Sequence, residues 1–509
     1  MKNNSIKTGA IISYISIFLN IIISLIYTPW MIREIGMSDY GIYSLIVSFL
    51  SYFLLDFGLS EAISRFISKF RAKGDNRGID KMFSVTTIVY AFLSLLIGLV
   101  LFVIYFFLSD IFVKLTPEEI VTLRKVYIIA GFFSVCNFCL KPFDGVLVAY
   151  EKFITLKMLD LVQRVGTVLL ITITLLLGGD IIGLVLINGL VAMVVSLIKL
   201  GFLFRTEPIK INIRLFEKSV AKDLFNFSFW VFFINIAQRL RLNIIPTILG
   251  VFCGTKEIAI FSVAMNLEGF IYIFSNALNG LFMPKVSRMI NSENASSELT
   301  DLMIKVGRIQ LYIVGFIIVG LFGLGQSFIH LWIGDSFSRT YYVMVFLVVL
   351  YFISMTQQIG TTVSYVVNEV KYNSIFAITT SVLSLIIALC VAPKWGAIGC
   401  GFAVFVALLV NNILMNIFYY RKLKLDIRKF FYKCHFKILP CLILFLFVLL
   451  FVEHSIKVDS WYMLFALGFV YTIVFFSVLF FFVMNDYEKN LIINSILRKQ
   501  SNYSAPLWA

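Results

Sequence analysis

The sequence predicts an all-α membrane protein with about fourteen transmembrane helices. Of its 509 residues, 60% are hydrophobic and 14% are charged, whereas a soluble domain has about 45–50% apolar and about 25% charged residues. Apolar stretches of roughly 20 residues recur along the whole chain, and each is long enough to cross a bilayer core of about 30 Å as a helix. The alternating segments of about ten residues that indicate a transmembrane β-barrel are not seen in the sequence.

The first apolar run, residues 11–32, follows Lys2 and Lys7 and resembles a secretion signal in its charge pattern. It is longer than the apolar region of a signal, and no small-residue cleavage site follows it, so we expect a retained first span. The expected spans are approximately 9–31, 40–60, 83–108, 127–149, 164–179, 182–203, 225–249, 258–282, 309–332, 341–366, 373–392, 398–419, 438–452 and 461–484.

The distribution of positive charge predicts the orientation of these spans. An even number of spans places both termini on one side of the membrane. With the N-terminus in the cytoplasm, 32 of the 43 Lys and Arg residues fall in cytoplasmic segments and 8 in outer segments, as the positive-inside rule requires. We therefore expect the net charge of +15 to meet anionic lipid headgroups rather than nucleic acid.

The second half of the chain repeats the first at a shift of about 217 residues. Pro29 corresponds to Pro246, Gly36 to Gly254, and the run 41–44 to the run 259–262. Six spans separate the copies, so both enter the membrane in the same direction, as in transporters whose paired bundles hold the substrate between them. We expect two six-helix lobes, residues 1–210 and 211–425, followed by two additional helices and a cytoplasmic tail within residues 426–509. The alternative is a chance likeness between two apolar six-helix blocks.

Few side chains in this sequence could carry out catalysis. The three histidines, His330, His435 and His454, are far apart in the sequence, so neither a metal site nor a catalytic pair is indicated. No glycine-rich loop with a following lysine is present to bind ATP phosphates. The pair Cys136 and Cys139 lies in a predicted span without a second pair nearby, and packing explains it better than metal or redox chemistry. We expect a protein that is not an enzyme and that holds no metal or cofactor.

Two stretches of the first half resemble a known family. The runs 28–44 (TPWMIREIGMSDYGIYS) and 55–66 (LDFGLSEAISRF) are similar to the opening of Wzx-type polysaccharide flippases. These proteins belong to the multidrug/oligosaccharidyl-lipid/polysaccharide (MOP) exporter superfamily. The second half carries a similar pattern at 246–254, 260–262 and 284–287.

The resemblance implies the MOP fold, also called MATE-like, with two six-helix lobes around a central cavity. It implies transport of undecaprenyl-pyrophosphate-linked oligosaccharide repeat units from the cytoplasmic to the outer leaflet of the bacterial inner membrane, for O-antigen or capsule assembly. The expected partners are this lipid-linked oligosaccharide, membrane lipids, and the polymerase and chain-length regulator of the same pathway. A proton or sodium gradient is the expected energy source. Many members carry an acidic residue on the seventh span, where this chain has Asn243.

Other functions compete with this interpretation. A multidrug antiporter of the same superfamily is expected to hold acidic residues in its cavity for cationic drugs, whereas the centre of the seventh span here carries Arg239 and Arg241. A lipid II exporter of the same superfamily shares the fourteen spans, but its characteristic N-terminal pattern is not seen. An O-antigen polymerase is expected to have a large outer loop, and none is predicted.

Charged residues inside spans are the candidate site residues, because a central Arg or Lys costs roughly 2.5–3.5 kcal/mol on insertion scales. Lys141 and Asp144 lie three apart beside Pro142 and are expected to pair on one helix face. Either could be a charge partner or a coupling residue, as could Asp56 in the family-like motif.

Arg239 and Arg241 point about 200° apart on a regular helix, so one of them needs a separate explanation. Glu268 is expected at nearly the same depth as Arg241 on the next helix, and we expect these two to pair. Arg239 with Gln238 would then face the cavity and bind the lipid pyrophosphate, for which a guanidinium is well shaped. The alternative is that both arginines are structural.

Overall fold

The computed structural model describes residues 2–54, 59–207, 209, 236–237, 239–276, 282–290 and 292–496. Within these ranges the regular structure is helical, with no strand, which confirms the predicted all-α class. The helices of the first half are α1 (Lys2–Phe53), α2 (Leu59–Ala72), α3 (Asn76–Ile111), α4 (Pro117–Leu140), α5 (Pro142–Ala149), α6 (Phe153–Leu176) and α7 (Ile181–Thr206). Those that follow are η2 (Arg239–Asn243), α9 (Ile244–Phe252), α10 (Thr255–Asn276), α11 (Met283–Met289), α12 (Ala295–Ile333), α13 (Thr340–Val348), α14 (Tyr351–Ser354), α15 (Gln358–Val366), α16 (Val370–Arg421), α17 (Ile427–Phe430), α18 (Lys437–Ser455), α19 (Trp461–Val478) and α20 (Asp486–Ile496), with short η3–η6 turns between them.

Ten helical segments in the described part of the chain are long and apolar enough to cross a membrane. Two of the longest helices change direction at a glycine with positive φ, α1 at Gly36 (φ 84°) and α16 at Gly396 (φ 56°). Glycine suits both positions because it has no Cβ to clash in that conformation. The span predicted at 225–249 lies largely outside the described residues, and the total of fourteen stays a prediction.

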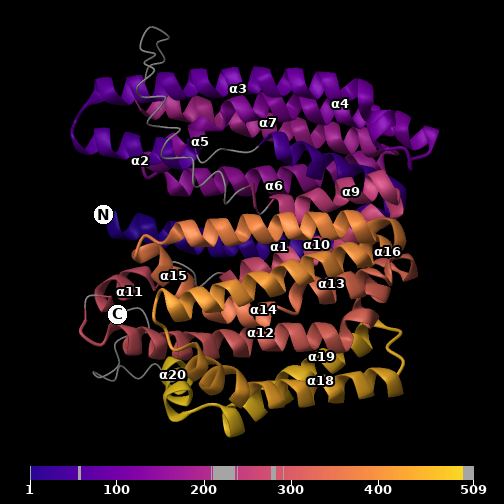
Figure 1. Cartoon of the computed structure of the whole chain (residues 1–509). Coiled ribbons are helices and arrows are strands. Elements are labelled where there is room, and N and C mark those ends of the chain that lie inside the picture. Colours follow the sequence, from indigo (N-terminus) through magenta and orange to yellow (C-terminus); the bar gives the residue numbers. More distant parts are fainter. Residues whose placement is uncertain are drawn as a thin grey trace. The chain divides into compact units, whose positions relative to one another are not determined.

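Residues 1–262 and 385–397 form one compact unit. In this unit α4 packs between α3 and α7, α6 packs against α1 and α7, and the short α2 packs on α5 (Figure 1). The buried face of α2 is apolar, with Leu59, Ile63 and Ile67 fully buried, while Lys69 and Arg71 stand in its last turn.

The turn after Gly36 is tied to the start of α10 within this first unit. The Glu119 carboxylate accepts hydrogen bonds from Ser38 Oγ (2.5 Å) and Thr255 Oγ1 (2.7 Å). A Cβ on Gly41 would lie 2.3 Å from the Thr255 carbonyl oxygen. The backbones are therefore in direct contact here, and only glycine fits at position 41 without a shift.

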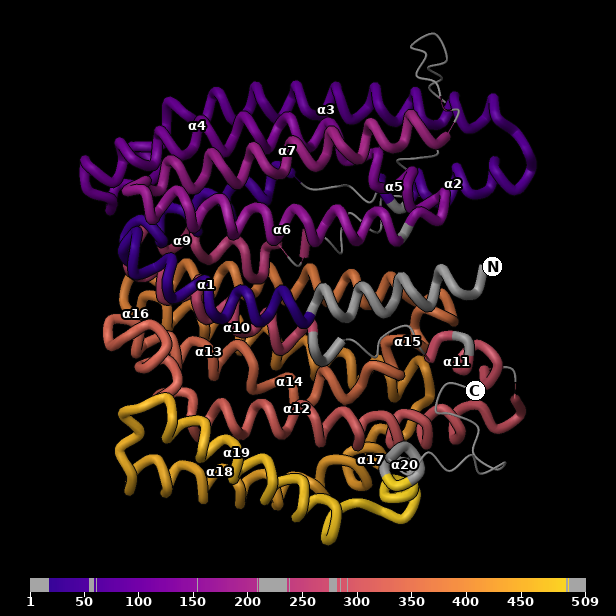
Figure 2. Tube along the Cα trace, turned by 180° about the vertical axis from the view of Figure 1, so that it is seen from behind, coloured from indigo at the N-terminus to yellow at the C-terminus, as the bar shows by residue number. Residues whose placement is uncertain are grey.

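Residues 263–384 and 398–509 form the second compact unit. Its centre is α12, which packs against α15, α18 and α19, and Figure 2 shows α18 and α19 running beside α12. Aromatic rings contribute to this interface: the Phe316 and Tyr471 rings stack at 5.0 Å, and the Phe475 ring lies 5.3 Å from that of Phe316.

Backbone conformation agrees with the predicted repeat. Glu151 (φ 59°) and Asn368 (φ 61°) are two of three non-glycine residues with positive φ in the described chain, and they stand 217 positions apart. Each follows a short helix that begins where the preceding helical segment is interrupted. Glu151 follows α5, which begins after Lys141, and Asn368 follows α15, which begins at Gln358. The same unusual turn at the same spacing is not expected from composition alone. The lobe boundaries predicted at 210 and 425 stay predictions.

Candidate functional site

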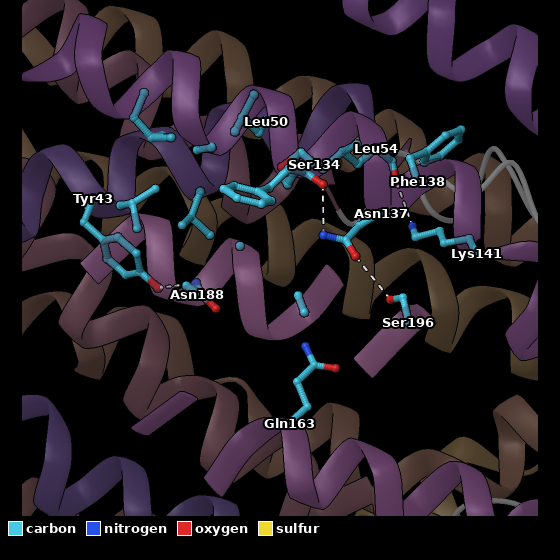
Figure 3. A pocket seen from close by; sticks show the side chains of 18 of the residues that line it. Tyr43, Leu50, Leu54, Ser134, Asn137, Phe138, Lys141, Gln163, Asn188 and Ser196 are labelled. Carbon is cyan, nitrogen blue, oxygen red and sulfur yellow. Dashed lines mark hydrogen bonds between the residues drawn. The ribbon is translucent and has the colours of Figure 1, made fainter. Parts of the chain in front are cut away.

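The first unit contains a cavity of about 480 Å³. Its wall is formed by the second part of α1 together with α4, α5, α6, α7 and Arg239 of η2 (Figure 3). This volume is in the usual range for small-molecule sites. Polar and charged side chains line a cavity among apolar helices, which makes it the candidate functional site.

Lys141 stands at the break between α4 and α5. Pro142 begins α5 and cannot donate a backbone hydrogen bond, so the helix is interrupted here. The Lys141 side chain is directed toward α1. Its Nζ donates a hydrogen bond to the Leu54 carbonyl oxygen at 3.0 Å, near the end of α1. A cation at a helix C-terminus is favourable because it offsets unpaired carbonyl groups there.

The predicted pair between Lys141 and Asp144 was wrong, because Asp144 pairs with Lys199 on α7 instead. Lys199 Nζ lies 3.0 Å from Asp144 Oδ1 and 3.0 Å from Asp160 Oδ1. The lysine is 7% exposed, so two carboxylates compensate one buried ammonium group. The break at Pro142 carries Asp144 onto a separate short helix, where it meets α7.

Sequence reasoning missed Lys199 and Asp160 because it counted Lys199 among the cytoplasmic charges, although the predicted span 182–203 contains it. In the structure α7 continues to Thr206, and Lys199 lies inside it. Arg164 was missed for the same reason: it lies within α6, where its Nη2 donates to Ser24 Oγ at 2.6 Å. The available signal was the place of Lys199 inside the predicted span 182–203, and of Arg164 at the first residue of the predicted span 164–179 with Asp160 one turn before it.

Arg239 lines this cavity within the first unit, whereas Arg241 is not part of its wall. The predicted binding of the lipid pyrophosphate by Arg239 stays a prediction. Both lie in η2, a turn of π-helix over residues 239–243 rather than the regular α-helix that was expected. Such turns are frequent at functional sites. Arg239 is half-buried, and it has no hydrogen bond or ion pair with any other residue in the described part of the chain. Asn243 of the same turn donates to Ser51 Oγ at 3.3 Å.

The other predicted site residues lie in different units or outside the described residues. Glu268 is buried in the second unit, where its carboxylate accepts a hydrogen bond from the Tyr351 hydroxyl. Arg241 belongs to the first unit, so its predicted ion pair with Glu268 stays a prediction. Asp56 and Gln238 lie outside the described residues.

The repeat provides an internal comparison for these charges. At the spacing of 217 set by Glu151 and Asn368, four charged residues at and near the first-half cavity correspond to uncharged ones in the second half: Lys141 to Gln358, Asp144 to Thr361, Asp160 to Ala377 and Arg164 to Ser381. A role in packing common to both halves would not require charge in only one. Of the four, Lys141 and Asp144 line the cavity, so its charged wall is specific to the first half.

These features define a class: a multi-pass helical membrane protein with two repeated halves and an ionic cavity in the first. The family is also shown, because the model of the family described as "Polysaccharide biosynthesis protein" matches residues 6–290. The chain belongs to this family. No curated protein matches the sequence.

Several solved structures share the fold. The lipid II flippase MurJ in its inward closed conformation is 14% identical, with 93% of this chain and 98% of that chain covered and a TM-score of 0.71. An inward-facing multidrug resistance MATE family transporter of the MOP superfamily is 15% identical, with 77% and 93% covered and a TM-score of 0.61. A MOP superfamily transporter from Pyrococcus furiosus is 14% identical, with 81% and 93% covered and a TM-score of 0.59. The predicted MOP fold is confirmed.

Proposed function

We propose that the protein is a flippase that moves undecaprenyl-pyrophosphate-linked oligosaccharide repeat units across the bacterial inner membrane. The family, which is one of polysaccharide biosynthesis, and the MOP fold support transport of a polysaccharide precursor. The observation that carries the proposal is Arg239, a half-buried cation on the cavity wall that has no carboxylate partner in the described chain.

The balance of charge on the cavity wall favours an anionic ligand. Lys141, Lys199 and Arg239 line it together with one carboxylate, that of Asp144. Lys199 is compensated by Asp144 and Asp160, and Lys141 is directed to a backbone carbonyl. Arg239 is therefore the cation available to a ligand, and its planar guanidinium can donate two parallel hydrogen bonds to phosphate oxygens.

The same balance argues against a multidrug exporter. A cationic drug needs an uncompensated carboxylate in the site, but Asp144 is held at 3.0 Å by Lys199. The MurJ fold likeness is compatible with a lipid-linked substrate, although at 14% identity it does not select lipid II.

The topology completes the proposal. Both termini are in the cytoplasm, and the basic ends of the spans contact anionic headgroups of the cytoplasmic leaflet. A proton or sodium gradient drives the cycle. The polymerase and the chain-length regulator of the pathway receive the repeat unit after it has crossed.

Complementation of a strain that lacks the gene tests the proposal. We expect lipid-linked repeat units to accumulate in the inner leaflet of the deletion strain and Arg239→Ala to restore little transport at matched membrane expression. Arg239→Lys should restore part of it, because the charge remains while the paired donors are lost. Lys256→Ala, which removes an exposed cation at the start of α10, is the matched control and should transport normally. Full transport by Arg239→Ala would refute the role of this residue.

A further inference from the structure

The two ends of the first-half cavity differ in chemistry. Along α4 the wall extends from Ala130 to Lys141, the residue that follows the helix, and on α7 it extends from Val185 to Lys199. Eleven residues separate Ala130 from Lys141, which is about 16 Å at 1.5 Å per residue of helix. Figure 3 shows Lys141 far from the Tyr43–Asn188 pair, with Asn137 between them. A single small ion cannot contact both ends, whereas an elongated ligand can.

The end away from the lysines carries uncharged hydrogen-bonding groups. Asn188 Nδ2 donates weakly to the Tyr43 hydroxyl at 3.4 Å, and its amide oxygen accepts no hydrogen bond within the described chain. Gln163 of α6 lies between the two ends, one helical turn from Asp160, and points toward the cavity (Figure 3); its amide has no hydrogen-bond partner among the described residues. Amide groups in an apolar surrounding are costly unless water or a ligand bonds to them.

Comparison with the second half shows that these amides are not a general feature of the repeat. At the spacing of 217, Gln163 corresponds to Thr380, which is buried and bonds back to the Phe376 carbonyl of its own helix at 2.7 Å. Asn137 corresponds to Ser354, and both bond back within their own helices: Asn137 Nδ2 donates to the Phe133 carbonyl at 2.9 Å, and the Ser354 hydroxyl donates to the Leu350 carbonyl at 3.3 Å. The halves therefore differ at Gln163, whose amide has no hydrogen-bond partner in the described chain, whereas Thr380 bonds within its own helix.

Aromatic rings complete this part of the wall. Phe133 packs directly on the backbone of α7 at Gly189, where a Cβ would lie 2.4 Å from the ring. Gly189 therefore lets the ring lie against α7 instead of filling the cavity. Phe133 and Tyr43 together with amide side chains provide apolar faces for C–H groups and hydrogen bonds for hydroxyl groups, which is what a sugar ring presents.

We infer that Gln163 and Asn188, with Tyr43 and Phe133, form a sugar-binding subsite that contacts the first sugars next to the lipid pyrophosphate. This inference rests on the proposed function, in which Arg239 binds the pyrophosphate. The sugar body of the substrate extends along α4 and α7 toward Tyr43 and Asn188. The subsite thus distinguishes glycosylated from sugar-free lipid.

Equilibrium binding to the purified full-length protein in lipid nanodiscs tests the subsite. The two probes are undecaprenyl pyrophosphate and the same lipid bearing the native oligosaccharide. Because one neutral hydrogen bond is worth about 0.5–1.5 kcal/mol, Gln163→Ala and Asn188→Ala should each weaken binding of the glycosylated probe about 2- to 12-fold. Binding of the sugar-free probe should not change. Arg239→Ala should weaken binding of both probes.

Two further variants separate recognition from folding. Gln163→Met keeps the length of the side chain without its amide and should behave as Gln163→Ala does. Thr380→Ala, at the corresponding position of the second half, should bind both probes as the wild type does. Unchanged affinity of Gln163→Met and Asn188→Ala for the glycosylated probe would overturn the subsite, as would an equal loss for both probes. A wild-type protein that binds neither probe would overturn the proposed function, and the subsite with it.

Discussion

A buried ion pair in the second unit fixes the last helix of the described chain. Arg308 of α12 and Glu488 of α20 are 5% and 4% exposed. Arg308 Nε lies 2.5 Å from Glu488 Oε1, and Nη2 lies 3.0 Å from Oε2, so the pair is bidentate. The same guanidinium donates to the Lys433 and Val483 carbonyls. Arg308→Met, which keeps a long apolar stem, is therefore predicted to release α20.

The loss of stability in Arg308→Met follows from the Glu488 carboxylate that is left buried without its cation. Without Arg308, the buried Glu488 carboxylate keeps only the Tyr312 hydroxyl at 2.9 Å and the Asn485 backbone N–H at 3.0 Å. Removal of one partner of a buried pair costs about 3–5 kcal/mol, whereas replacement of both by apolar residues is often nearly neutral. Three kcal/mol corresponds to a factor of roughly 10² in the opening equilibrium. Arg308→Met should therefore destabilise the docked helix, and Arg308→Met/Glu488→Met should recover most of the loss.

Hydrogen exchange of the α20 backbone amides measures this opening directly. Exchange in Arg308→Met should be at least about 10² times faster than in the wild type, and the double variant should lie within roughly tenfold of the wild type. Exchange of α4 in the first unit serves as the internal control and should not change. Unchanged α20 exchange in the single variant would refute the argument, as would equally fast exchange in the single and double variants.

Two stability predictions concern the first unit, and both are measured by thermal unfolding of the purified protein. Gly41→Ala should lower stability by about 1–3 kcal/mol, because the new Cβ meets the Thr255 carbonyl oxygen. In Gly201→Ala on α7 no atom lies within 4 Å of the new Cβ, so stability should be unchanged or rise by up to about 1 kcal/mol. Equal destabilisation of the two variants would contradict the packing argument. Lys199→Met should cost about 1–3 kcal/mol because it leaves two partly exposed carboxylates without their ammonium group. Lys199→Arg should retain most of that stability, and a Met variant as stable as the wild type would show that the pairing contributes nothing.

Much of the fold could be predicted because it depends on local and periodic features of the sequence. Apolar length indicates the spans, and the repeated glycines and prolines indicated two related halves, which the turns at Glu151 and Asn368 support. The interruption at Pro142 was not predicted: residues 127–149 were expected to form one continuous span, whereas α4 ends at Leu140 and α5 begins at Pro142.

The candidate site could be predicted only in part, because its contacts join residues distant in the sequence. Arg239 was identified from its depth in an apolar run. The partner of Asp144 was not, since Lys199 is 55 positions away on another helix and nothing in the local pattern favours it over Lys141. The π-helical turn at Arg239 was also unexpected, because no sequence rule distinguishes it from a regular helix.

Reconstitution tests the central claim most directly. Purified protein is inserted into liposomes that contain undecaprenyl-pyrophosphate-linked oligosaccharide labelled on the sugar, and the label in each leaflet is followed with a sugar-oxidising enzyme added outside. The account predicts that the wild type moves the protected fraction across the bilayer and that Arg239→Ala does so much more slowly at equal protein density. Movement by the wild type no faster than in protein-free liposomes, under an imposed proton or sodium gradient, would contradict it.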